Sequence, residues 1–114
     1  MVQYYGFLLN SQRMLELGIE KGLGSDESFH GRECLRTRAA WDLLAEAEVD
    51  DWCTVVNVTT RNGKAYWCIA LASTDHRETV YTHRNLPPQH LVDQVKTMLE
   101  KPDHVQPMWW DSTF

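Results

Sequence analysis

Residues 54–71 read TVVNVTTRNGKAYWCIAL, two runs of β-branched and aromatic residues on either side of Asn62-Gly63. An Asn-Gly pair between two such runs is typical of a β-hairpin closed by a two-residue type I′ turn. That turn predicts a register in which Arg61 faces Lys64. Because the side chains of a strand alternate, this register also decides which residues share a face of the hairpin.

The predicted register divides the hairpin side chains between two faces. We expect the first face to be core, and it carries Trp52, Thr54, Val56, Val58, Thr60, Trp67, Ile69 and Leu71. The second face is small and mixed, and it carries Cys53, Val55, Asn57, Thr59, Arg61, Lys64, Tyr66, Cys68, Ala70 and Ala72. This second face is too apolar to be fully wet and too polar to be buried. We therefore expect it to be half covered, as a dimer interface or a shallow ligand cleft.

The patterns outside the hairpin predict further strands and helices. The apolar residues 2–9 form a strand, and the capping pair Asn10-Ser11 begins a helix that ends at glycines 22 and 24. A second helix follows and extends to about residue 48. Residues 79–83 are read as a third meander strand, and an amphipathic helix lies between Leu86-Pro87-Pro88 and Pro102.

The order β-α-α-β-β-β-α-tail predicts an α+β fold. Contiguous strands after helices favour an antiparallel sheet, here a β-meander about Asn62-Gly63 that helices cover on one face. At 114 residues, the length fits a single globular domain over residues 1–114.

The composition excludes some classes of function and favours others. A net charge of −5 disfavours nucleic-acid binding, which needs Lys and Arg to displace counterions. No apolar run is long enough to span a membrane, and residues 1–10 lack a basic leader. The 3 cysteines are an odd number without framework spacing. We therefore expect a reduced, cytoplasmic protein.

The sequence contains no motif for a metal ion or a cofactor. The 5 histidines are scattered without the paired spacing of zinc ligands, so no metal and no cofactor is expected. Cys68 and His83 would meet if the meander were correct, which leaves a nucleophile pair as an open alternative. We therefore favour a binding protein over an enzyme.

The second helix has an unusual order of charges. Its arginines precede its acidic residues, whereas the helix dipole favours acid first and base last. Arg32 and Arg36 lie one turn apart and are a candidate anion-binding pair, unless Glu33 and the acids that precede it neutralise them. The acidic residues 42–51 are a solvated helix end or a contact for a basic partner.

The C-terminal residues 105–114 are short and aromatic. Met108, Trp109, Trp110 and Phe114 are too apolar to remain in water, so they fold back on the domain or are buried against another chain. Trp is also the commonest anchor of protein interfaces. With Val55 and Ala70 of the mixed hairpin face, these residues are the predicted interface.

The leading functional hypothesis is a small, acidic, non-enzymatic binding or regulatory protein, inhibitor-like or adaptor-like. It acts through contacts with a protein partner and self-associates as a two-fold homodimer. The alternative is a small-ligand or enzyme domain that uses the mixed hairpin face. Its predicted contacts are Asn57, Thr59, Tyr66 and Cys68.

Overall fold

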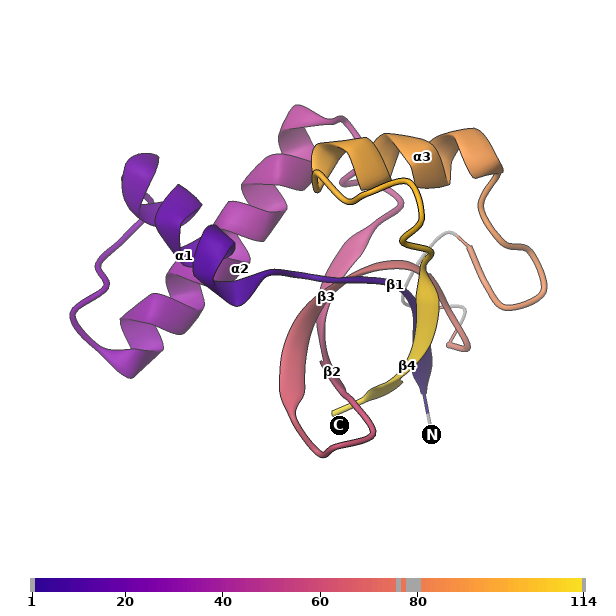
Figure 1. Ribbon diagram of the computed structural model, residues 1–114, viewed down its shortest axis with the longest axis horizontal. Coiled ribbons are helices and arrows are strands. Elements are labelled where there is room, and N and C mark those ends of the chain that lie inside the picture. Colours follow the sequence, from indigo (N-terminus) through magenta and orange to yellow (C-terminus); the bar gives the residue numbers. More distant parts are fainter. Residues whose placement is uncertain (1, 76, 78–80, 114) are drawn as a thin grey trace.

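The computed structural model describes residues 2–75, 77 and 81–113 (Figure 1). It has the α+β composition that the sequence predicts, with helices and antiparallel strands interleaved along the chain. The elements in order are β1 (Gln3–Leu8), α1 (Ser11–Glu20), α2 (Phe29–Glu46), β2 (Thr54–Thr59), β3 (Ala65–Ser73), α3 (Gln89–Met98) and β4 (Met108–Ser112).

Short polar residues begin the first two helices, and a glycine ends the first. The side chains of Asn10 and Ser28 cap α1 and α2, accepting hydrogen bonds from the backbone N–H groups of Arg13 at 3.0 Å and Gly31 at 2.9 Å. After α1, Gly22 adopts a φ of 64°, and the N–H of Leu23 bonds back to Gly18 O at 3.0 Å. This is the Schellman ending that a glycine permits.

The four strands form a closed antiparallel barrel in the order β1-β3-β2-β4. The expected meander is therefore wrong in its connectivity. The tail residues Met108–Ser112 form β4, which closes the barrel between β1 and β2. Of the expected strand over 79–83, residues 79 and 80 lie outside the described residues, and Thr82 makes isolated bridges to Ser73 and Asn85.

The hairpin turn is one residue longer than predicted. The backbone N–H of Thr60 donates to Lys64 O at 2.9 Å, so the loop comprises the three residues 61–63. Gly63 has a φ of 80°, but Asn62 is absent from the described non-glycine residues with positive φ, which excludes a type I′ turn. Instead, Asn62 Oδ1 accepts hydrogen bonds from the Thr60 hydroxyl and from the backbone N–H of Lys64. This is the three-residue hairpin with a left-handed glycine.

The longer loop shifts the pairing of β2 with β3 by one residue, so the side chains of β2 change faces relative to those of β3. Val56 lies opposite Cys68 and Val58 opposite Tyr66, instead of Ile69 and Trp67. A one-residue shift exchanges the faces of every side chain on the strand. Val56 and Val58 are therefore core residues as predicted, but they face the barrel interior with Cys68 and Ala70, and do not share a face with Ile69 and Leu71.

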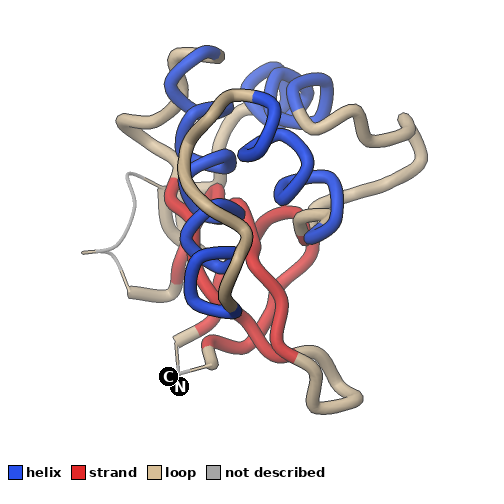
Figure 2. Tube along the Cα trace, turned by 90° about the vertical axis from the view of Figure 1, so that its left-hand side faces the viewer, coloured by secondary structure: helices blue, strands red, loops and turns tan. Residues whose placement is uncertain are grey.

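Two apolar clusters result from this register. The first lies between the barrel wall and the helices, where Phe7, Ile69 and Leu71 pack with residues of α1, α2 and α3. Figures 1 and 2 show the helices gathered on one side of the strands. The second cluster draws side chains from all four strands and fills the barrel: Tyr4, Val58, Cys68 and Ala70, with Val2, Leu8, Val56 and Trp110 beside them.

Barrel closure requires a close approach of β1 to β3 at Gly6. A Cβ atom at Gly6 would lie 1.8 Å from the carbonyl oxygen of Ile69. The pairing of β1 with β3 also shifts register between Tyr5 and Gly6, which is typical of a bulge that bends a strand. Gly6 is thus the point at which the backbone of β1 bends around the barrel.

We expect Gly6→Ala to lower the free energy of unfolding by about 3 kcal/mol or more, because the methyl group meets backbone that cannot move aside. Urea denaturation followed by tryptophan fluorescence measures the loss. Gly24→Ala is the matched control, because its Cβ would meet only side-chain atoms, Leu35 Cδ2 at 3.3 Å and Arg38 Nη1 at 3.4 Å, which need shift by only a few tenths of an ångström. Its effect should stay within about 1 kcal/mol, and equal effects of both substitutions would contradict the close approach at Gly6.

Candidate functional site

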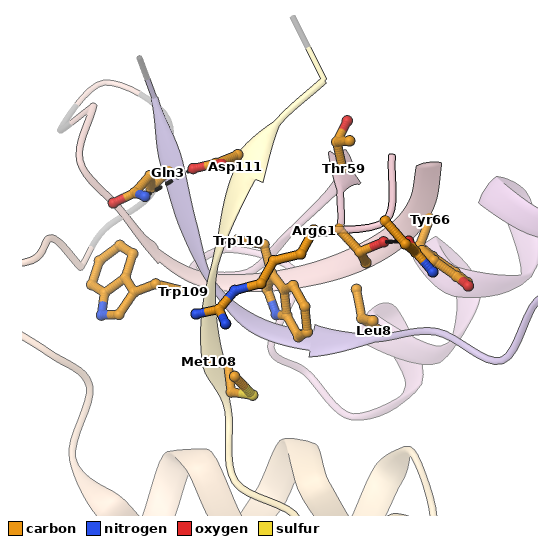
Figure 3. Close-up of a pocket in the computed structure, with 11 residues that line it drawn as sticks. Gln3, Leu8, Thr59, Arg61, Tyr66, Met108, Trp109, Trp110 and Asp111 are labelled. Carbon is orange, nitrogen blue, oxygen red and sulfur yellow. Dashed lines mark hydrogen bonds between the residues drawn. The ribbon is translucent and has the colours of Figure 1, made fainter. Parts of the chain in front are cut away.

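A groove of about 700 Å³ opens between the hairpin loop and β4. It combines aromatic, aliphatic and charged side chains, and Figure 3 shows them around the first half of β4. Its lining residues are Gln3, Leu8, Thr59, Thr60, Arg61, Asn62, Tyr66, Met108, Trp109, Trp110 and Asp111. The volume lies within the range of ligand-binding sites in proteins.

The groove exists because β2 leaves β4 after two residue pairs. Val58 pairs with Ser112 and Thr59 with Asp111, and the described ladder ends there. Continued in the same register, the ladder would place Thr60 beside Trp110 and Arg61 beside Trp109. These residues instead belong to the hairpin loop, which Asn62 closes on itself. The seam of the barrel is therefore open along the first half of β4.

Trp110, Leu8 and Tyr66 provide the apolar surface of the groove. Trp110 is half-buried against the barrel interior, and its Nε1–H donates to Gly6 O at 3.2 Å. Leu8 and Tyr66 line the groove from the neighbouring strands β1 and β3. Met108 completes this surface and is 56% exposed. An exposed Met beside half-buried aromatic rings is typical of the residue types that form protein interfaces.

The outer side of β4 is occupied by contacts within the chain. The Trp109 ring points away from the groove and packs on Tyr5 with a centroid distance of 5.2 Å (Figure 3). The side-chain amide of Gln3 donates to Asp111 Oδ1 at 2.8 Å. This bond holds the carboxylate of Asp111 in place where β1 and β4 run side by side.

Arg61 is the cationic residue of the groove. Its side chain extends from the loop toward β4 (Figure 3). Within the described part of the chain, no hydrogen bond or ion pair reaches its guanidinium group. An exposed guanidinium over an aromatic surface can bind a carboxylate with two parallel hydrogen bonds.

The structure separates the residues of the predicted interface. Met108 and Trp110 lie in the groove, and Trp109 contributes its part of β4. Ala70 is fully buried because the barrel closes over its side of β3. The observed register turns Val55 toward the cluster beneath the helices. Phe114 lies outside the described residues.

Two of the four predicted ligand contacts line the groove. Thr59 and Tyr66 do so, but Cys68 is fully buried and Asn57 Oδ1 accepts a hydrogen bond from the Thr113 hydroxyl at 2.7 Å. His83, the partner considered for a nucleophile pair, is exposed whereas Cys68 is not. The half-covered face expected from the sequence is therefore divided between the barrel interior and its outer wall.

The candidate anion-binding pair is engaged within the chain. Arg36 forms an ion pair with Glu33, and its Nε–H donates to Ser11 O at 3.1 Å. Glu33 also accepts a hydrogen bond from Trp67 Nε1 at 2.8 Å, which connects α2 to the hairpin. Arg32 donates to Asp26 O at 3.2 Å. These contacts fasten α2 to its surroundings.

Two of the three cysteines are poor candidates for a nucleophile because they are buried. Burial raises the pKa of the Cys68 thiol, and burial together with the nearby Asp51 carboxylate raises the pKa of Cys53. Both thiols therefore stay protonated near neutral pH, and the thiolate is the reactive form. Cys34 on α2 is half-buried, with its Sγ atom 3.5 Å from His30 Nε2.

The described residues provide neither a metal site nor a membrane-spanning helix. No group of three or more His, Cys, Asp or Glu side chains is arranged to hold a metal ion. None of the described helices is long and apolar enough to cross a membrane.

Sequence reasoning missed Leu8, Gln3 and Arg61 as groove residues. Leu8 and Gln3 reach the site through β1, whose pairing with β4 joins residues about one chain length apart, Gln3 with Asp111. The sequence places Arg61 opposite Lys64 beside the turn, with no predicted neighbour from outside the hairpin. The sequence also shows an aromatic C-terminal tail. It does not indicate that the turn and the tail lie side by side.

We expect a thiol reagent at pH 8 to modify Cys34 alone in the native protein, because Cys53 and Cys68 are buried and protonated. All three cysteines should react in guanidinium chloride. Cys34→Ser should abolish native labelling. Fast native labelling of Cys68, identified by mass spectrometry, would contradict its place inside the barrel.

The comparisons with known proteins are negative. No protein-family model matches the chain, and neither a curated protein nor a solved structure matches it. The groove and the chemistry of its residues are therefore the basis for inferring a function.

Proposed function

We propose that this chain is a small non-enzymatic binding protein that acts through protein–protein contacts made by the groove beside β4. The observation that carries the proposal is the convergence on one open seam of exposed Met108, half-buried Trp110 and Arg61, whose guanidinium has no partner among the described residues. Trp, Tyr and Arg dominate the binding energy of protein interfaces, and Met is enriched there.

The scaffold supports such a role because the groove is held by rigid elements. Trp110 is fixed by its bond to Gly6 O and by the barrel interior. The opposite wall is a loop closed by the internal hydrogen bonds of Asn62. A preformed surface loses less conformational entropy on binding than a mobile one. A preformed binding surface is sufficient for an inhibitor or adaptor, which regulates its partner by binding to it.

The small-ligand or enzyme alternative has less support. Its predicted contact residues do not lie in one site, because Thr59 and Tyr66 line the groove while Cys68 and Asn57 do not. Of the residues weighed for nucleophilic chemistry, Cys68 is enclosed by the barrel. The groove has the volume of a ligand site, but its open form and mixed lining suit an extended surface.

We expect Met108→Asp to abolish capture of partner proteins, because it places a charge at an exposed apolar position of the groove. The measurement is affinity capture from the source cells with quantitative mass spectrometry. Phe29→Asp is the matched control, since Phe29 is 72% exposed at the start of α2, away from β4 (Figure 1). Proteins retained by Phe29→Asp and lost by Met108→Asp support the proposal. Identical capture by the two variants would overturn it.

The same variants distinguish a different protein from a second copy of this chain, the homodimer expected from the sequence. Two copies related by a two-fold axis would each bury the same groove. Sedimentation velocity at increasing concentration should then show a dimer for the wild type and for Phe29→Asp, and a monomer for Met108→Asp. A monomer throughout would remove self-association and leave a different protein as the partner.

A further inference from the structure

We propose that the groove receives an extended segment of the partner, which adds as a strand alongside β4 and carries a carboxylate to Arg61. This inference rests on the proposed function and specifies the chemistry of the partner. Three observations support it: the backbone of Trp109, the apolar surface around Trp110, and the exposed guanidinium of Arg61 in the loop.

The backbone of β4 offers an unpaired edge at Trp109. The N–H of Ser112 donates to Val2 O on the β1 side, and the N–H of Thr113 donates to Asn57 O on the β2 side. Because these directions alternate along a strand, the N–H and C=O of Trp109 point toward β2. The described β2–β4 ladder ends at Asp111, so these two groups face the groove without a strand partner. An extended peptide would satisfy both, as in strand addition to other sheet edges.

The side chains around this edge fit a segment that alternates in polarity. A residue placed opposite Trp109 would share the outer face of Trp109, so its two neighbours would point inward. Inward lies the apolar surface of Leu8, Tyr66 and Trp110. The segment should therefore carry apolar side chains at positions i and i+2.

The positive charge of Arg61 determines which charged group the bound segment must carry. Arg61 lacks a hydrogen-bond or ion-pair partner among the described residues, and the nearby Asp111 carboxylate is held by Gln3. Salt bridges of an exposed guanidinium gain most when binding removes water and the geometry is bidentate. The complementary group is a carboxylate, which an Asp or Glu side chain or a C-terminus can supply.

The test selects peptides that bind the full-length protein from a phage-displayed library of random eight-residue peptides. Selected sequences are synthesised with free and with amidated C-termini, and their Kd is measured by fluorescence anisotropy. We expect two apolar residues at i and i+2 with an Asp or Glu nearby, and a loss of about tenfold or more in affinity for Arg61→Glu. Binding should also shift the Trp109 amide resonance and slow its hydrogen exchange.

Lys64→Glu is the matched control, because Lys64 is exposed on the same hairpin but does not line the groove. It should change the affinity by no more than about twofold, as an exposed charge outside the contact does. Loss of binding on amidation would assign the carboxylate to a C-terminus. Retention would assign it to a side chain. Either outcome supports the proposal.

Three results would overturn the inference. They are the absence of selected peptides, binding without a carboxylate, and equal losses for Arg61→Glu and Lys64→Glu. None of these decides the proposed function, because capture of a folded partner by the wild type and its loss with Met108→Asp are measured separately. A partner that is captured through the groove while no peptide binds would show a folded contact surface in place of a strand.

Discussion

The hydrogen bonds that Asn62 accepts within its own loop decide most of what distinguishes this protein. They close a three-residue turn, which shifts the hairpin by one residue and places Val56 and Val58 inside the barrel. Thr60 and Arg61 belong to this turn and do not pair with β4, and the described ladder between β2 and β4 ends after two residue pairs. The arrangement of the core and the opening of the groove therefore both involve the three-residue turn.

Residues of β4 contribute both to the packing of the barrel and to the surface of the groove. Trp110 packs with the barrel interior and also lines the groove, while the ring of Trp109 lies on Tyr5 outside the barrel. The strand is held along β1, where Gly6 allows a close approach to the β3 backbone. Residues that close a barrel are fixed by many contacts, which makes the groove they border a preformed surface.

The sequence predicts the elements of this fold better than their pairing. Helical periodicity and caps locate the helices, and the β-rich runs locate β2 and β3, because these signals are local. The register depended on whether Asn62 adopts a positive φ, which the Asn-Gly pair favours but does not dictate. The strand β4 was missed because MWWDS does not alternate and its partner β1 lies at the opposite end of the chain. Trp110 and Met108 could still be predicted as site residues from their apolar character, whereas Arg61 and Leu8 needed the fold.

The groove requires that the edge of β4 at Trp109 is open in the free protein. Amide hydrogen exchange, resolved by nuclear magnetic resonance, measures this directly. We expect rapid exchange at Trp109 and slow exchange at Trp110, whose N–H points toward its partner Tyr4 on β1. Equal protection of the two amides would show that the seam is already paired and that no strand can add there.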